Sequence, residues 1–61
     1  MATYKPGQIV PTSGIYAEKD AYGILLTEVT CVKNEKFPPT MGRGDHFELV
    51  RAAKHRHSEG V

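Results

Sequence analysis

The chain has 61 residues, of which 39% are hydrophobic and 25% are charged, and its formal net charge is +1. This length suits one domain near the lower limit for independent folding, and the composition is too apolar for a fully disordered chain. The sequence has no apolar stretch of about 18 residues and no apolar segment close to Met1, which argues against a membrane span and a signal peptide. We therefore expect a soluble, cytoplasmic protein without membrane contact.

Cys31 is the only cysteine of the chain. A single cysteine excludes an intrachain disulfide, whereas small domains usually gain stability from disulfides, a structural metal or a partner chain. With no obvious set of metal ligands in the sequence, the shortage of stabilising cross-links favours self-association or an unidentified ligand.

The segment from residue 3 to residue 14 is expected to form an extended arm. Pro6-Gly7 predicts a turn, because proline presets the first central φ and glycine accepts the positive φ that follows. Pro11 has no amide hydrogen, which excludes a central strand. We expect the arm to cross the domain and to be anchored by two apolar residues, Ile9 and Val10.

Three segments have the pattern of short β-strands, and they comprise residues 15–18, 24–32 and 46–51. The first and third alternate with period two, and the second is rich in β-branched residues, which argues against a helix. Gly23 is expected to close a hairpin loop between the first two strands.

These segments predict a mostly β fold, a small three-stranded antiparallel meander that occupies residues 1–51 as a single domain. Residues 52–61 are expected to form a frayed, flexible tail that is polar and basic. The predicted sheet has one apolar face, which the arm or a second subunit would cover. This face is expected to contain Ile15, Ala17, Leu25, Val29, Cys31, Phe47 and Leu49.

A sheet of this size has two edges with unpaired backbone amides, and such edges template the addition of further strands. Phe37-Pro38-Pro39 adds a preformed polyproline segment. We therefore expect a non-enzymatic interaction protein that self-associates through its sheet edges or binds another protein. The predicted contact residues are Tyr16, Phe37, Pro38 and Pro39. An equally suitable role for Pro38 and Pro39 is purely structural: they would only end the second strand, as proline commonly does.

Three groups of residues occur in a familiar order along the chain. They are Lys5-Pro6-Gly7-Gln8 with Pro11 and Ser13-Gly14-Ile15-Tyr16, then Glu28-Val29-Thr30 leading into Phe37-Pro38-Pro39, then Phe47-Glu48-Leu49-Val50. This order resembles small bacterial proteins of the YjzC-like type and a related set of short zinc-ribbon-like proteins. The resemblance implies common ancestry and carries no established activity.

The zinc-ribbon-like proteins have paired cysteines after Phe-Pro-Pro, where this chain has Thr40-Met41-Gly42-Arg43. Threonine and arginine are not usual zinc ligands. The resemblance therefore implies a degenerate member without this metal site, and we expect no cofactor. One thiol and three imidazoles are side chains of the kinds that bind zinc, and the chain has them at Cys31, His46, His55 and His57. Their spacing, however, lacks the paired arrangement that structural zinc sites have.

Enzymatic activity is not expected. Cys31 is the natural nucleophile to consider, but it lies within a predicted strand on the predicted core face, where a thiol is protonated and unreactive. A sheet of three short strands also offers little concave surface for a substrate pocket.

Nucleic-acid binding is the alternative function. The cations available for it are Arg43, Arg51, Lys54 and Arg56. The sequence pI of 7.9 is below the value of about 9 that nucleic-acid-binding domains typically exceed. The sequence therefore favours protein interaction over this alternative.

Overall fold

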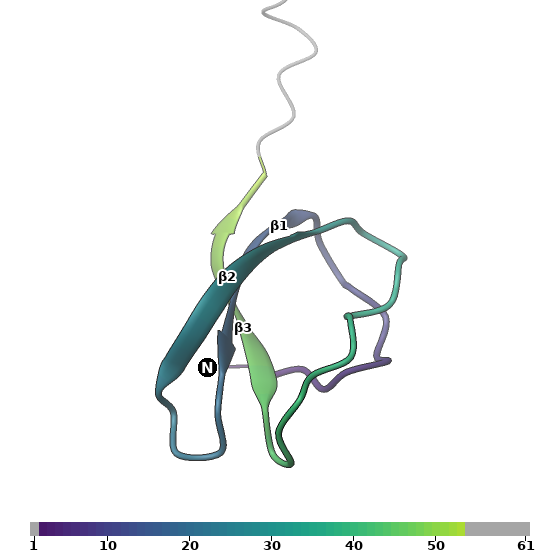
Figure 1. Ribbon diagram of the computed structural model, residues 1–61. Helices are drawn as coiled ribbons and strands as arrows, with labels where there is room; N and C mark the ends of the chain where they lie inside the picture. The colour runs from purple at the N-terminus through teal and green to yellow at the C-terminus, as the bar shows by residue number, and fades with distance from the viewer. Residues whose placement is uncertain (1, 54–61) are drawn as a thin grey trace, which may run out of the picture.

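Three antiparallel strands form one open sheet in the structure, a computed structural model that describes residues 2–53. They are β1 (Gly14–Lys19), β2 (Leu25–Cys31) and β3 (His46–Ala52), as Figure 1 shows. The predicted mostly β fold with three antiparallel strands is confirmed. Residues 2–53 contain no helix that is long and apolar enough to cross a membrane. β3 extends to Ala52, the first residue of the predicted tail, and residues 54–61 lie outside the described part.

The strand order is β2-β1-β3, so β1 is the central strand. A meander would instead have β2 in the centre, and the connectivity differs from the prediction in this respect. The tight hairpin after β1 places β2 on one side, and the chain then makes a long connection before β3 pairs with the other side of β1. The connection does not fold back to place β3 beside β2, because its residues 34–37 pair with the N-terminal arm.

The hairpin between β1 and β2 has the predicted turn chemistry. The Asp20 carboxylate accepts hydrogen bonds from the backbone N–H groups of Tyr22 and Ile24, at 2.9 and 3.0 Å. Gly23 has a φ of 86°, a conformation that glycine adopts without the steric cost of a Cβ atom. The loop is therefore closed by an aspartate at its start and a glycine at its end.

The N-terminal arm is held by backbone pairing at two places. Tyr4 exchanges two hydrogen bonds with Phe47 of β3, at 2.9 and 2.8 Å. Further along, the Val10 N–H donates to the Glu35 carbonyl and the Asn34 N–H donates to the Val10 carbonyl. The side chain of Val10 is fully buried, as the sequence predicts for an anchor. Ile9 is 54% exposed, so the prediction of a second anchor there is wrong.

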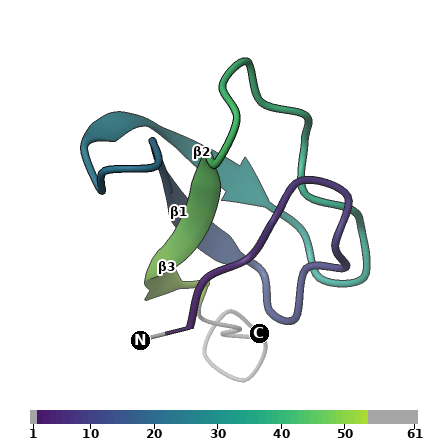
Figure 2. The same ribbon diagram turned by 90° about the horizontal axis from the view of Figure 1, so that it is seen from below.

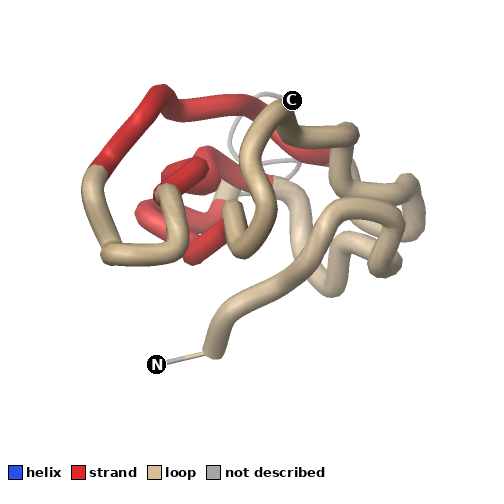
Figure 3. The backbone as a smooth tube through the Cα atoms, turned by 60° about the horizontal axis from the view of Figure 1, so that its bottom comes forward, coloured by secondary structure: helices blue, strands red, loops and turns tan. Residues whose placement is uncertain are grey.

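The arm and the connection between β2 and β3 lie together on one side of the sheet (Figures 2 and 3). Between them and the sheet is a cluster of aromatic rings contributed by Tyr4, Tyr16, Phe37 and Phe47. Phe37 stacks on both Tyr4 and Phe47, with ring centroids 5.2 and 5.0 Å apart. The Tyr16 ring meets Tyr4 and Phe37 edge-on, and its hydroxyl donates to the Thr12 carbonyl at 2.7 Å.

The two faces of the sheet divide the apolar residues differently from the prediction. Paired residues of antiparallel strands project to the same face. Tyr16 pairs with Val29 and Leu49 and therefore shares with them the face that meets the arm. Of the seven predicted core-face residues, Val29, Cys31, Phe47 and Leu49 lie on this inner face.

Ile15, Ala17 and Leu25 lie on the opposite face, so the predicted face is wrong for these residues, although Ala17 is buried there and only 5% exposed. For Ile15 and Ala17 the reason is that β1 alternates without interruption and its other set, which contains Tyr16, faces the core. For Leu25 the reason is an irregularity in register between Glu18 and Lys19, and a second irregularity lies between Ile15 and Tyr16. Each adds an unpaired residue to the neighbouring strand, and an added residue interrupts the period-two pattern on which the sequence prediction depends.

Gly14 makes the close approach of β1 to β3 possible. A Cβ atom at this position would clash with the carbonyl oxygen of Arg51 and lie 2.9 Å from the Cα of Ala52. Both are backbone atoms of paired segments and cannot rotate away. We expect Gly14→Ala to lower the free energy of unfolding by about 3 kcal/mol, measured by chemical denaturation.

Gly23→Ala is the matched control, because a Cβ atom there meets nothing within 4 Å and the cost arises only from the positive φ. We expect this variant to lose about 1 kcal/mol. A loss at Gly14 that is no larger than the loss at Gly23 would contradict the steric explanation.

Candidate interaction surface

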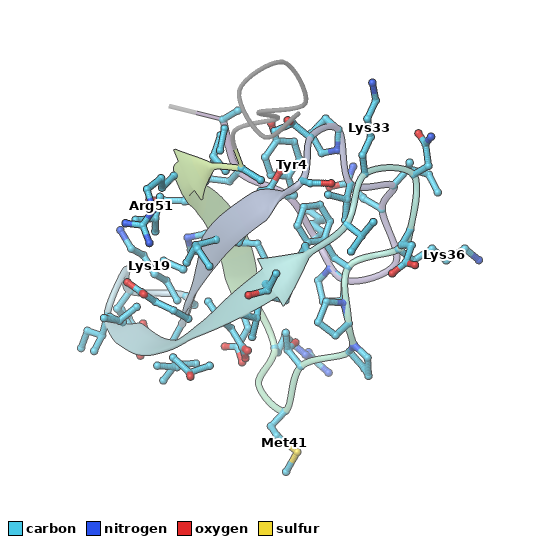
Figure 4. The ribbon with its side chains drawn as sticks, turned by 90° about the horizontal axis from the view of Figure 1, so that it is seen from above. Tyr4, Lys19, Lys33, Lys36, Met41 and Arg51 are labelled. Atoms are coloured by element: carbon cyan, nitrogen blue, oxygen red, sulfur yellow. The ribbon has the colours of Figure 1, made fainter. Side chains whose placement is uncertain are left out.

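The face of the sheet away from the aromatic cluster, here called the outer face, combines apolar and charged side chains. Cross-strand pairing assigns it Ile15, Ala17, Lys19, Leu25, Glu28, Thr30, His46, Glu48 and Arg51. Lys19 and Arg51 extend from the side of the sheet that faces away from Tyr4 (Figure 4). The arm and the β2–β3 connection lie on the other side, so these segments leave the outer face uncovered.

A charged network ties β1 to β3 on the outer face. The Nζ atom of Lys19 lies 2.9 Å from Oε1 of Glu48, and Nε2 of His46 lies 3.6 Å from Oε2 of the same carboxylate. The hydrogen bond from Lys19 holds the pKa of the Glu48 carboxyl below its usual value, and the positive charge of Lys19 lowers it further. Both partners are partly buried, so the network joins the two strands rather than offering a free charge to a partner.

A run of exposed apolar side chains begins in the hairpin and continues into β2. We call it the β2 apolar strip, and it consists of Tyr22, Ile24, Leu25 and Leu26. These side chains are 90%, 61%, 54% and 50% exposed in chain order. By contrast, the buried hydrophobic residues of the described chain number six. Exposed apolar residues that are adjacent in this way are typical of protein-binding surfaces.

The strip lies beside an open sheet edge. In the part of the chain that the structure describes, β2 pairs only with β1, so the backbone groups along its other side have no strand partner. At the corresponding edge of β3, the backbone of Phe47 is paired with Tyr4 of the arm. β2 is therefore the more accessible edge, and apolar side chains accompany its free backbone groups.

The predicted contact residues do not form one surface. Tyr16 is fully buried and Phe37 is 2% exposed, so neither can contact a partner in the folded chain, and the prediction was wrong for both. Pro38 is half-buried and Pro39 is exposed. The reason is the size of the core: with so few buried hydrophobic residues, the large aromatic rings are needed to fill it.

The candidate nucleic-acid residues are spread over the molecule. Arg43 is exposed in the loop before β3 and Arg51 is exposed on β3, whereas Lys54 and Arg56 lie outside the described residues. Figure 4 shows Lys33 and Lys36 on the opposite side of the molecule from Arg51. Residues 2–53 contain six lysines and arginines and six acids, so their net charge is zero. This part of the chain presents no basic footprint of the kind that nucleic-acid binding uses.

The candidate metal ligands are not brought together in the part of the chain that can be described. Cys31 is 6% exposed, and burial raises the pKa of its thiol above the usual value. His46 lies beside Glu48, and His55 and His57 fall outside the described residues. Residues 2–53 contain no group of three or more histidine, cysteine, aspartate or glutamate side chains that could hold a metal ion.

Comparison of the chain with protein-family models, with curated proteins and with solved structures gives no match. The resemblance to YjzC-like and zinc-ribbon-like proteins therefore stays a prediction. The loop that has Thr40-Met41-Gly42-Arg43 in place of paired cysteines lies between Pro39 and β3, and the side chain of Met41 points into solvent at its tip (Figure 4).

The Lys19–Glu48 pair predicts a specific dependence of stability on pH. The folded pKa of Glu48 is lower than the unfolded value of about 4.3, so the ionised carboxylate stabilises the fold above that pH. This contribution is lost as the pH falls through the folded pKa. We expect Glu48→Gln to be less stable than the native chain at pH 7 and to approach it at pH 3, measured by urea denaturation.

Glu28→Gln serves as the control, because Glu28 is exposed and has no ion pair among the described residues. We expect its stability difference from the native chain to be the same at both pH values. A constant difference for Glu48→Gln across this range would show that the ion pair does not stabilise the fold.

Proposed function

We propose that this chain is a small, non-enzymatic interaction protein of the cytoplasm that forms homo-oligomers through the open edge of β2. The observation that carries the proposal is the coincidence of this free edge with the β2 apolar strip. An added strand would satisfy the unpaired N–H and C=O groups of β2 and would remove Leu25 and Leu26 from water at the same time. Backbone pairing and apolar burial then act together at one place.

A second copy of the chain is a suitable occupant because its β2 edge has the same properties. Two β2 strands that pair in antiparallel fashion about a two-fold axis would join two three-stranded sheets into one continuous sheet. Glu28 limits the register of this pairing, since like charges directly opposite each other destabilise a sheet. The axis is therefore expected to pass near a neighbour such as Thr27 or Val29 instead of Glu28.

The alternative of nucleic-acid binding has less support. The exposed side chains of Arg43 and Arg51 favour it, but residues 2–53 carry no net charge. Binding that depends on phosphate contacts would weaken steeply with salt, whereas strand pairing with apolar burial would change little. The salt dependence of any observed association therefore distinguishes the two functions.

Leu25→Lys tests the proposed edge. Leu25 is 54% exposed, so the substitution leaves the aromatic core intact while it places a cation in the apolar strip. We expect the native chain to form dimers or larger assemblies in sedimentation equilibrium. We expect the variant to raise the dimer dissociation constant at least about tenfold, which corresponds to about 1.4 kcal/mol.

Ile9→Lys is the matched control, because Ile9 has the same exposed fraction of 54% but lies on the arm. We expect this variant to associate as the native chain does. A native chain that is monomeric at all concentrations, or equal weakening by both variants, would contradict self-association through β2.

A further inference from the structure

A pocket of about 310 Å³ lies between the N-terminal arm and the loop that leads into β3. Its walls are formed by Thr3, Lys5, Pro6, Thr40, Gly44, Asp45 and His46. This volume is at the small end of the range of roughly 300–1,000 Å³ that ligand pockets span. The pocket shares no residue with the β2 apolar strip, so its role is independent of the proposed self-association.

The pocket contains a carboxylate that is almost completely buried. Asp45 is 7% exposed, and its Oδ2 atom accepts a hydrogen bond from the Gly42 N–H at 2.9 Å. None of the lysines and arginines of residues 2–53 lies within 4.0 Å of this carboxylate. An ionised carboxylate can accept about four hydrogen bonds. No side-chain oxygen of Asp45 is both shielded from solvent and without a hydrogen-bond partner, so the oxygen that is not bonded to Gly42 keeps contact with solvent. Asp45 therefore retains the capacity to bind a cationic group.

The loop is built to hold this carboxylate in place. The Asp45 N–H donates to the Gly42 carbonyl at 3.3 Å while the Asp45 side chain accepts from the Gly42 N–H, so the two residues are joined twice. A Cβ atom on Gly42 would lie 2.8 Å from Oδ1 of Asp45. The absence of a side chain at Gly42 leaves room for the carboxylate.

Lys5 supplies the opposite charge from the other wall of the pocket. It belongs to the arm, its side chain is exposed, and it forms no ion pair with the acids of residues 2–53. The arm is fixed next to β3 by the pairing of Tyr4 with Phe47, which places Lys5 across the pocket from the loop. The pocket thus presents one acid and one cation that are not paired with each other.

We propose that this pocket binds a small zwitterion, a free amino acid in its simplest form. The ammonium group of the ligand pairs with the Asp45 carboxylate, and its carboxylate pairs with the Lys5 ammonium group. Both contacts are charge-assisted hydrogen bonds, which are stronger than bonds between neutral groups. Thr3, Thr40 and Pro6 complete the walls around the ligand.

The pairing of charges in the pocket selects against simpler ligands. A lone cation would be attracted by Asp45 but repelled by Lys5. A lone anion would be attracted by Lys5 but repelled by Asp45. A divalent metal ion generally requires several oxygen ligands, whereas the pocket wall offers one carboxylate. A molecule with both charges satisfies both residues at once.

Titration of the 61-residue chain with glycine, followed by backbone amide chemical shifts in NMR spectra, tests the proposal. We expect saturable shifts at Lys5, Gly44, Asp45 and His46. Methylammonium and acetate carry the two charges separately, and we expect each to bind at least about tenfold more weakly than glycine, the factor for loss of one charge-assisted hydrogen bond. Binding of either ion as tight as that of glycine would overturn the proposal.

Two variants remove the charges one at a time. Asp45→Asn keeps an oxygen that accepts from the Gly42 N–H and removes only the negative charge, and Lys5→Met keeps a side chain of similar length. We expect each to weaken glycine binding at least about tenfold while Lys36→Met, whose cation does not line the pocket, leaves it unchanged. Absence of glycine binding to the native chain, or unchanged binding by both charge variants, would also overturn the proposal.

Discussion

The stacking of aromatic rings around Phe37 is the interaction on which the rest of the molecule depends. Its four members come from four separate segments: Tyr4 from the arm, Tyr16 from β1, Phe37 from the β2–β3 connection and Phe47 from β3. Two of these segments have no place in the sheet. The cluster therefore joins the arm and the connection to the strands, and it provides most of the buried apolar volume of a chain without disulfides.

The same cluster determines which surfaces remain free. Because the arm and the connection both lie over the inner face, the outer face and the open edge of β2 receive no cover from them. The pairing of Tyr4 with Phe47 also brings Lys5 opposite the loop that contains Asp45. The proposed self-association site and the proposed ligand pocket are thus two results of one arrangement of the arm.

The sequence predicts the local features of the fold well. Each end of the three strands lies within one residue of its predicted position, and Gly23 lies in the predicted hairpin loop with a positive φ. The strand order and the division of the faces depend on contacts between distant segments and on two irregularities of register. The alternation along β1 does not show which of its two faces is buried, since Tyr16 on one face is as suitable for a core as Ile15 and Ala17 on the other.

The candidate sites were harder to predict for the same reason. Aromatic and proline residues are typical of contact surfaces, but Tyr16 and Phe37 are needed in the core of so small a domain. The sequence offered one signal for the β2 apolar strip, the adjacent pair Leu25-Leu26, which breaks strict alternation where the sheet register shifts. The burial of Asp45 depends on the fold of its loop around Gly42, which the residue types of the loop do not specify.

The pairing of Tyr4 with Phe47 has a consequence for the order in which the chain acquires its structure. The hairpin of β1 and β2 is formed by residues close in sequence and can form early, since closing a short loop costs little entropy. The later part of the arm pairs with residues 34–37, but Tyr4 has no backbone partner until β3 is in place. During synthesis, Tyr4 leaves the ribosome long before Phe47, and the aromatic rings of the N-terminal half stay exposed in this interval. The cluster cannot close until both Phe37 and Phe47 are available, so formation of the core waits for the later half of the described chain.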